Sequence, residues 1–134
     1  MGKIISVLGA TGSVGKQALE VAKSRGYTVD FISANKNATA MERVVREYMP
    51  RFVAMADEAA CRELKTRIAD TSVKLLSGSE GIIEGILSSE SETVVNSILG
   101  EAGLMPTLAT VDAGKRLALA NKESLVIAGD IVML

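Results

Sequence analysis

The sequence predicts an α/β fold: a Rossmann-like, doubly wound parallel sheet formed by a single domain. Short apolar runs of strand length alternate along the 134 residues with segments of helical periodicity. Several of these runs are predominantly apolar along their whole length, which is typical of strands that helices cover on both faces. Only 3% of the residues are aromatic, so aliphatic side chains have to form the core between sheet and helices.

The runs of strand length are residues 4–8, 29–33, 52–55, 73–76, 93–99 and 116–120. Right-handed crossovers between successive parallel strands would distribute the intervening helices over both faces of the sheet. Ligands of such sheets bind at the carboxyl ends of the strands, close to the point where the strand order reverses. We therefore expect residues 9–15, 33–37 and 100–103 to border one crevice.

Two helices are expected in the first part of the chain. The first opens within residues 9–15 and would end at Gly26, a residue suited to a left-handed helix stop. Its inward face would consist of Val14, Ala18, Val21 and Ala22. The second would open with a capping box at 39–42 and end before Pro50. Its inward face would consist of Met41, Val44, Val45, Tyr48 and Met49.

Three further helices are expected in the rest of the chain. Asp57 can cap a third helix, Ser79 a fourth, and a fifth would cover 105–113. The residues expected to face inward are Cys61, Leu64 and Ile68 in the third helix and Ile82, Ile83, Ile86 and Leu87 in the fourth. The polar stretch 88–92 is predicted as a surface loop that joins the two halves of the sheet.

Charge and composition exclude several kinds of function. With 15 Lys and Arg against 16 Asp and Glu, the chain has no field that would attract nucleic acid. No apolar run is long enough to span a membrane or to form the core of a signal peptide. The single Cys61 and the absence of His exclude an internal disulfide, a Cys/His zinc site and His-dependent catalysis within this chain. We expect a cytoplasmic protein.

A glycine-rich segment follows the first strand and opens the first helix, the context of a dinucleotide-binding loop. The candidate cofactor-binding residues in it are Gly9, Thr11, Gly12, Ser13, Val14 and Gly15. Glycines let the backbone approach a pyrophosphate, and the free amides around Ser13 and Val14 would compensate its charge. The alternative is a tight strand-to-helix turn with no ligand, in which Ser13 only caps the helix.

The second strand is followed by Asn35, Lys36 and Asn37, and no carboxylate stands at this strand end. Asp30 lies too early in the strand to reach a ribose there. Lys36 could neutralise a 2′-phosphate and the two asparagines could hydrogen-bond it, so NADP is preferred over NAD. The alternative is that all three are ordinary polar loop residues.

Asn121, Lys122 and Glu123 follow the last predicted strand, where side chains can reach the crevice and address a nicotinamide or a small substrate. Lys122 and Glu123 are the candidate catalytic residues of the chain. The alternative for this segment is a solvated helix start, where a glutamate is favourable for dipole reasons.

Taken together, these segments resemble the N-terminal, NADPH-binding domain of the 1-deoxy-D-xylulose 5-phosphate reductoisomerase family. The resemblance rests on residues 8–15 (LGATGSVG), 34–37 (ANKN), 100–104 (GEAGL), 106–108 (PTL), 113–115 (AGK) and 119–125 (LANKESL). It covers essentially all of 1–134, and its last segment is the most specific. In that family NADPH reduces a rearranged keto sugar phosphate to 2-C-methyl-D-erythritol 4-phosphate, a step of non-mevalonate isoprenoid synthesis.

The resemblance implies a role for each candidate residue. Thr11, Gly12, Ser13 and Val14 would hold the pyrophosphate, Asn35, Lys36 and Asn37 the adenosine-phosphate end, and Asn121 and Glu123 the nicotinamide side. Lys122 would contact the substrate, 1-deoxy-D-xylulose 5-phosphate. One departure is Asn35, where relatives often have Gly, which could alter the ribose-phosphate loop.

The same resemblance implies a truncated enzyme. The family's Mg²⁺ or Mn²⁺ ligands, its substrate-phosphate residues and its flap would lie beyond Leu134, and the whole enzyme would be a homodimer. The apolar residues 131–134 fit an artificial cut, since they would normally pack against following structure. Without the metal, the chain alone would have no turnover.

Two other interpretations remain open at the level of sequence. A semialdehyde-type dehydrogenase also uses a Gly-Ala-Thr-Gly loop, but needs a nucleophilic Cys, and Cys61 is expected to face the core. A stand-alone NADP-binding module would be complete at 134 residues and have no enzymatic activity.

Overall fold

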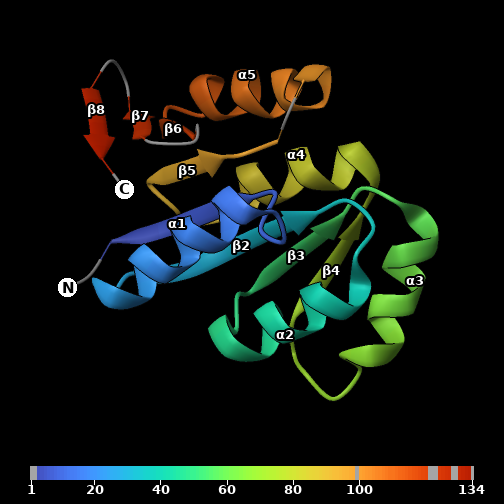
Figure 1. Cartoon of the computed structure of the whole chain (residues 1–134). Coiled ribbons are helices and arrows are strands. Elements are labelled where there is room, and N and C mark those ends of the chain that lie inside the picture. The colour runs from blue at the N-terminus through green and yellow to red at the C-terminus, as the bar shows by residue number, and fades with distance from the viewer. Residues whose placement is uncertain (1–2, 99, 121–123, 128–129, 134) are drawn as a thin grey trace.

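The structure, a computed structural model, describes residues 3–98, 100–120, 124–127 and 130–133 (Figure 1). In these ranges one sheet has the strand order β4-β3-β2-β1-β5-β6-β7-β8. Its strands are β1 (Ile4–Leu8), β2 (Thr28–Ala34), β3 (Phe52–Met55), β4 (Lys74–Ser77), β5 (Thr93–Asn96), β6 (Arg116–Ala120), β7 (Ser124–Ile127) and β8 (Asp130–Met133). Neighbours from β4 to β6 pair in parallel, which confirms the predicted Rossmann-like α/β fold.

Strands β7 and β8 extend the sheet beyond the predicted parallel set. β7 pairs with β6 and β8 pairs with β7, in both cases antiparallel. The apolar residues 131–133 were expected to pack against structure that follows them in the sequence. In this structure they form part of β8. Antiparallel neighbours need only a short connection, whereas parallel ones need a crossover, and only three residues separate β6 from β7 and two separate β7 from β8.

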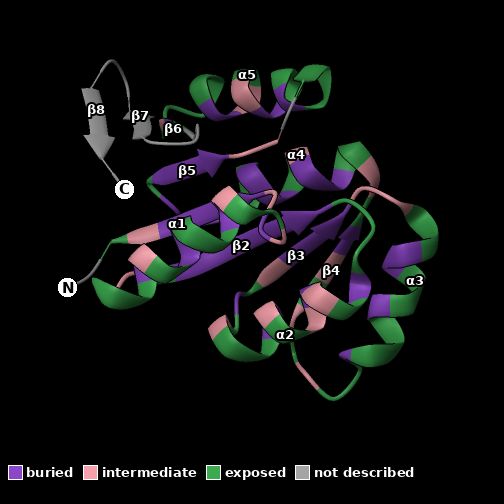
Figure 2. Cartoon of the chain, viewed as in Figure 1, coloured by how far each residue is buried: buried purple, intermediate pink, exposed green. Residues whose placement is uncertain are grey.

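Helices cover both faces of the sheet. They are α1 (Ser13–Ser24), α2 (Ala38–Tyr48), α3 (Glu58–Arg67), α4 (Gly78–Ser88) and α5 (Leu104–Asp112), with a 3-10 turn η1 (Gly100–Gly103) before α5. α1, α2 and α3 bury their apolar residues in one core cluster with Val7 and Ile32, while α4 and α5 pack over a second cluster around Leu8 and Phe31 (Figure 1). The central strands β1, β2, β3 and β5 are mostly buried (Figure 2). No helix within the described ranges combines the length and the apolar character that crossing a membrane requires.

The second helix begins and ends differently from its prediction. Asn37, not the expected capping box at 39–42, is the N-cap, and its Oδ1 accepts a hydrogen bond from the Ala40 amide at 3.0 Å. At the other end Met49 adopts a left-handed conformation with φ 48° and is 55% exposed, so its predicted burial is wrong. The chain has to leave the helix before Pro50, and a left-handed residue there turns its side chain away from the helix face.

The later helices follow their predicted patterns more closely. Asp57 caps α3 through the Ala60 amide at 2.9 Å, and Cys61, Leu64 and Ile68 are buried as expected. In α4 the residues Ile82 and Ile86 are buried, whereas Leu87 is 59% exposed. The helix begins at Gly78 with Ser77 as N-cap, earlier than the predicted start at Ser79. Phe31 lies against Gly85, and a methyl group at this glycine would collide with the ring, which lets α4 approach the sheet closely.

A buried polar network joins the amino ends of the strands. Asp30 lies in it, and burial alone would raise the pKa of this carboxyl group. Hydrogen bonds from Arg51 and from the Glu90 amide outweigh that effect, so the pKa of Asp30 lies below its usual value. Lys115 Nζ donates to the Ser89 and Ser91 carbonyl oxygens at 3.0 and 2.6 Å, and burial lowers the pKa of this amine.

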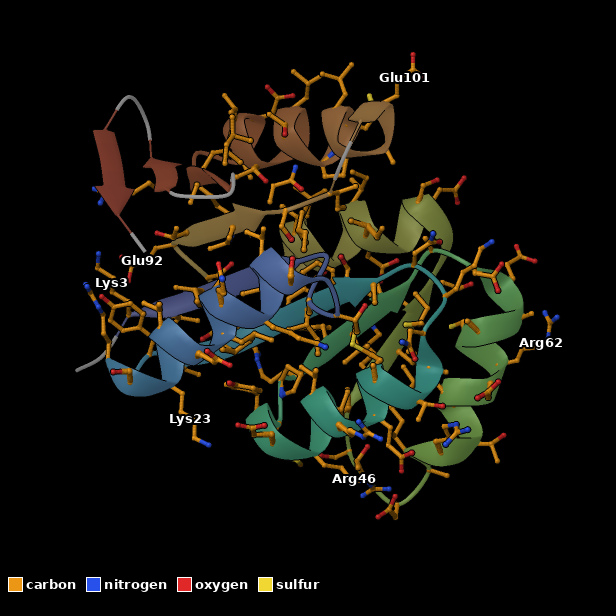
Figure 3. The ribbon with its side chains drawn as sticks, in the orientation of Figure 1. Lys3, Lys23, Arg46, Arg62, Glu92 and Glu101 are labelled. Atoms are coloured by element: carbon orange, nitrogen blue, oxygen red, sulfur yellow. The ribbon has the colours of Figure 1, made fainter. Side chains whose placement is uncertain are left out.

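The stretch 88–92 forms part of this network and is not a plain surface loop. Ser89 and Ser91 are 6% and 2% exposed, and both hydroxyl groups lie within hydrogen-bonding distance of Ser6 Oγ. Lys3 and Glu92 mark the same edge of the sheet, at the starts of β1 and β5 (Figure 3). The opposite edge is formed by the carboxyl ends of the strands, where the ligands of such sheets bind.

Candidate functional site

A cavity of about 730 Å³ lies at the carboxyl edge of the sheet. It lies over the point where the strand order reverses, because β1 is flanked by β2 on one side and by β5 on the other. Its wall contains Gly9, Thr11 and Gly12 from the glycine loop, Ser33, Ala34 and Asn35 from the end of β2, and Ser97, Ile98, Glu101 and Ala102 from the segment after β5. The three segments that the sequence predicts to border one crevice are therefore brought together.

The glycine loop is held against the end of β2 by backbone hydrogen bonds. The amides of Gly9 and Ala10 both donate to the Ser33 carbonyl oxygen, at 3.0 and 2.8 Å. The chain then turns back on itself, and the Gly12 amide donates to Gly9 O at 3.2 Å. Gly9 has φ 77°, a conformation that side chains disfavour. Gly15 lies against Gly9 O so closely that a methyl group there would overlap it, so α1 packs directly on the loop.

The amino end of α1 is suited to an anion. Its N-cap is Gly12, which has no side chain, and no side-chain hydrogen bond caps the helix. The first intrahelical bond reaches the Lys16 amide, so the amides of Ser13 and Val14 precede the helical ladder. The helices α2 and α3 have side-chain caps from Asn37 and Asp57, whereas α4 and α5, like α1, have none. The amides of Ser13 and Val14 lie outside the cavity wall but directly follow its Gly12, and free amides at this position fit a phosphate ligand.

The segment after β2 provides the other polar side chains. Asn35 lines the cavity and is exposed, and its carbonyl oxygen accepts a hydrogen bond from the Asp57 amide at 3.0 Å. Lys36 and Asn37 are exposed beside it, outside the cavity wall. Asn37 Oδ1 is used as the α2 cap, which leaves its amide NH₂ as the group that could reach a ligand.

Asp30 lies at the far end of the same strand. It is 4% exposed and bonded to Arg51, which confirms that it cannot serve the cavity as a ribose ligand. The carboxylate of Asp57 accepts a hydrogen bond from the Ala60 amide and so caps α3. The end of β2 therefore has the polar, carboxylate-free character from which the sequence predicts a preference for NADP.

Part of the cavity wall was not predicted from sequence. The start of α4 contributes Ser79, Glu80, Ile82 and Ile83, the end of β3 contributes Ala56, and the start of α5 contributes Met105 and Pro106. α4 belongs to the opposite face of the sheet from α1, so only the crossover geometry brings it to the glycine loop. Glu101 extends outward from η1, just before α5 (Figure 3), which puts its charge at the cavity rim.

Three predicted residues lie outside the described part of the chain: Asn121, Lys122 and Glu123. Cys61 is described, and it is 8% exposed, with Sγ 3.6 Å from Leu76 O. It is absent from the wall of the cavity. A nucleophile has to reach its substrate, so this position argues against the semialdehyde-dehydrogenase interpretation.

Known proteins of one family match the chain over most of its length. The family model described as 1-deoxy-D-xylulose 5-phosphate reductoisomerase matches residues 5–129. The enzyme of that name from Ruminiclostridium cellulolyticum is 42% identical over 133 residues, covering 99% of this chain and 35% of the relative. That from Halothermothrix orenii is 43% identical over 134 residues, covering 98% of this chain and 35% of the relative.

Solved structures give the same result. The Zymomonas mobilis enzyme in complex with NADPH superposes with a TM-score of 0.83 at 31% identity, over 90% of this chain and 32% of that one. A DOX-P reductoisomerase in complex with magnesium superposes with a TM-score of 0.85 at 30% identity, over 90% of this chain and 31% of that one. The chain spans 35% of the length of the curated relatives it matches. Since the family model covers residues 5–129, the chain belongs to the 1-deoxy-D-xylulose 5-phosphate reductoisomerase family.

Proposed function

We propose that residues 1–134 form the NADPH-binding domain of a 1-deoxy-D-xylulose 5-phosphate reductoisomerase. The whole enzyme would convert 1-deoxy-D-xylulose 5-phosphate to 2-C-methyl-D-erythritol 4-phosphate in the cytoplasm and act as a homodimer. The observation that carries the proposal is the cavity at the strand-order reversal, bordered by the glycine loop and by the carboxylate-free end of β2. A family relative of the same fold is described in complex with NADPH.

The described residues fit a dinucleotide. At Gly12 the backbone forms the cavity wall with no side chain in the way, and the amides of Ser13 and Val14 begin an uncapped helix. A pyrophosphate lying there would accept hydrogen bonds from these amides, and its negative charge would compensate the positive end of the helix dipole. Thr11, also on the wall, can add a hydroxyl hydrogen bond. Gly9 and Gly15 would contribute by letting the loop fold tightly under the phosphates.

Asn35, Lys36 and Asn37 would bind the adenosine-phosphate end. Lys36 supplies a positive charge for the 2′-phosphate, and amide groups of the asparagines can donate hydrogen bonds to it. Asn121 and Glu123 would bind the nicotinamide side, and Lys122 the substrate. When bound, NADPH supplies the hydride for the reduction step. The role of this chain is to bind the cofactor and fix the position of its nicotinamide.

The rearrangement step would depend on residues outside this chain. Magnesium is named with a family structure, and Mg²⁺ or Mn²⁺ would polarise the substrate oxygens in the whole enzyme. We place no metal ligand among residues 1–134. Lys122 and Glu123 could orient the substrate and the cofactor but could not replace a Lewis acid, so the chain alone would bind NADPH without turnover.

A calorimetric titration of the 134-residue chain with NADPH and with NADH tests the proposal. We expect saturable binding of NADPH and binding of NADH weaker by about tenfold or more, since the 2′-phosphate adds a charge-assisted contact. In Lys36→Ala the preference for NADPH should largely disappear. Lys16→Ala is a matched control, because Lys16 is exposed on α1 outside the cavity wall. Absence of binding by either nucleotide would refute the proposal.

A further inference from the structure

The side chain of Asn96 lies at the carboxyl end of β5, beneath the cavity, and is 4% exposed. Its Nδ2 donates to Gly103 O at 3.0 Å and to Thr107 Oγ1 at 2.9 Å, and its Oδ1 accepts from the Ile98 amide at 3.0 Å. One buried side chain thus bonds both ends of the segment 97–103 and the first turns of α5. Such a side chain determines the path of the loop around it.

That segment is the β5 side of the cavity wall. Ile98, Glu101 and Ala102 line the cavity. Ile98 is one of the two points that Asn96 holds, and Glu101 and Ala102 lie in sequence between it and the other, Gly103. The loop is closely folded at its far end, because a methyl group on Gly103 would come within 2.7 Å of Ile98 O. A small change in the direction of Asn96 would therefore move the wall.

The neighbouring Ser97 connects this wall to the glycine loop. Its amide donates to Leu8 O at 3.1 Å, and its hydroxyl group donates to the same oxygen at 2.6 Å and lies 3.2 Å from Gly9 O. A methyl group at Gly9 would come within 2.6 Å of Ser97 Oγ. The segment after β5 and the phosphate-binding loop therefore hold each other in place.

We propose that Asn96 is a positioning residue for the cofactor, which holds the 97–103 wall in the form that receives the nicotinamide half of NADPH. The inference rests on the proposed NADPH-binding function. Asn35 and Lys36 follow β2, on one side of β1, and would take the adenosine-phosphate end. A dinucleotide whose pyrophosphate lies over the end of β1 then extends its other half over β5, where Asn96 lies. Holding this wall in advance lowers the ordering cost of binding.

The test compares two ligands in variants of the 134-residue chain: NADPH, and adenosine 2′,5′-bisphosphate, which lacks the nicotinamide half. Asn96→Asp keeps the shape of the side chain but removes both Nδ2 hydrogen bonds. We expect this substitution to weaken the binding of NADPH about tenfold, while the affinity for adenosine 2′,5′-bisphosphate changes less than about twofold. Lys36→Ala provides the contrast, because it should weaken the binding of both ligands by a similar factor.

Thr107→Val and Thr107→Ser form a second, milder pair in case Asn96→Asp does not fold. The valine removes the acceptor for Asn96 Nδ2 and the serine retains it. We expect NADPH to bind about threefold more weakly to the valine variant and normally to the serine variant. All titrations are made at a temperature where circular dichroism shows each variant fully folded, so a lowered Tm alone does not change the affinity.

Two results would overturn the inference while the proposed function stands. One is unchanged NADPH affinity in folded Asn96→Asp, or in Thr107→Val if the former does not fold. The other is an equal loss for NADPH and adenosine 2′,5′-bisphosphate, which would indicate general loosening of the domain. Failure of the unsubstituted chain to bind NADPH would instead refute the proposed function and the inference with it.

Discussion

Arg51 and Asp30 form a two-point ion pair at the edge of the sheet opposite the cavity. Nε of the arginine lies 2.6 Å from Oδ1, and Nη2 lies 2.8 Å from Oδ2. The Glu90 amide donates to the same Oδ2 at 2.7 Å. The Asp30 side chain is only 5% exposed and its partners precede β3 and β5, so one carboxylate joins three segments of the chain. Its role is to stabilise the fold.

Replacing this carboxylate should destabilise the domain without changing its affinity for the cofactor. In Asp30→Asn the hydrogen bonds to Arg51 and to the Glu90 amide are lost or weakened, and we expect the free energy of unfolding at pH 7 to fall by about 2 kcal/mol. Urea unfolding followed by circular dichroism measures the change. NADPH affinity under folding conditions should be unchanged, because Asp30 lies away from the cavity wall. A large loss of affinity would place Asp30 in the binding site instead.

The contribution of Asp30 should also depend on pH. The pKa of this group is lower in the folded protein than in the unfolded chain, because its hydrogen bonds with Arg51 and the Glu90 amide outweigh the effect of burial. Stability from this source is therefore complete above the unfolded pKa, about 3.9, and is lost as the pH falls through the folded pKa. The difference in unfolding free energy between the unsubstituted chain and Asp30→Asn should shrink below about pH 4. An equal difference at pH 7 and pH 3 would contradict this assignment.

Gly12 and Gly15 should separate cofactor binding from folding. A methyl group on Gly12 would meet only Gly9 O, at 3.6 Å, and the residue has φ −78° and ψ 168°, which alanine adopts freely. Gly12→Ala should therefore change the stability by less than about 1 kcal/mol. Because the methyl group would stand on the cavity wall, NADPH should bind about tenfold more weakly.

Gly15→Ala should have the opposite profile. Its methyl group would overlap Gly9 O, and Ala10 Cα would lie within 2.9 Å, so backbone would have to move. We expect a loss of about 3 kcal/mol in unfolding free energy, measured by urea titration. Stability close to that of the unsubstituted chain in Gly15→Ala would show that α1 does not pack on the loop as described.

Asn37 should have two separable roles. Asn37→Asp retains an oxygen that can cap α2 through the Ala40 amide, so the Tm should not fall. The new negative charge would stand beside Lys36 and repel a 2′-phosphate, so NADPH should lose more affinity than NADH does. Calorimetric titration with both nucleotides measures the difference. Asn37→Ala is the control, and should lower the stability by about 1 kcal/mol. Equal losses for the two nucleotides would indicate that Asn37 is remote from the phosphate.

Hydrophobic patterning is sufficient to predict most of the fold. The bounds of β1, β3 and β6 agree with the predominantly apolar runs 4–8, 52–55 and 116–120. β1 and β3 are buried at all but their first residue, as expected of strands that helices cover on both faces. The apolar run 93–99 is longer than β5, which ends at Asn96. There the Asn96 side chain accepts a hydrogen bond from the Ile98 amide, and the chain turns. Apolar periodicity cannot predict such an effect of a single side chain.

Long-range pairing limits the rest of the prediction. Ser89 and Ser91 are typical of a surface loop by residue type, but Lys115, some 24–26 residues later, bonds both of their carbonyl oxygens and they are buried. In the cavity, Gly9, Thr11, Gly12 and Asn35 lie where the glycine spacing and the end of β2 predict. The α4 residues of its wall have no local signal, since they arrive from a helix on the other face of the sheet.

Met49 and Gly26 offer a last test, because they share a left-handed backbone, with φ 48° and φ 72°, just after a helix. A side chain in this conformation costs about 1 kcal/mol relative to glycine. Met49 is 55% exposed and loses little packing when it is removed, so Met49→Gly should raise the unfolding free energy by about 0.5 kcal/mol or more. Gly26→Ala should lower it by about 1 kcal/mol, although a methyl group there would meet nothing within 4 Å. Urea unfolding of both variants decides the matter: a loss of stability in Met49→Gly would mean that α2 continues past Tyr48 and buries Met49, as its apolar pattern alone predicts.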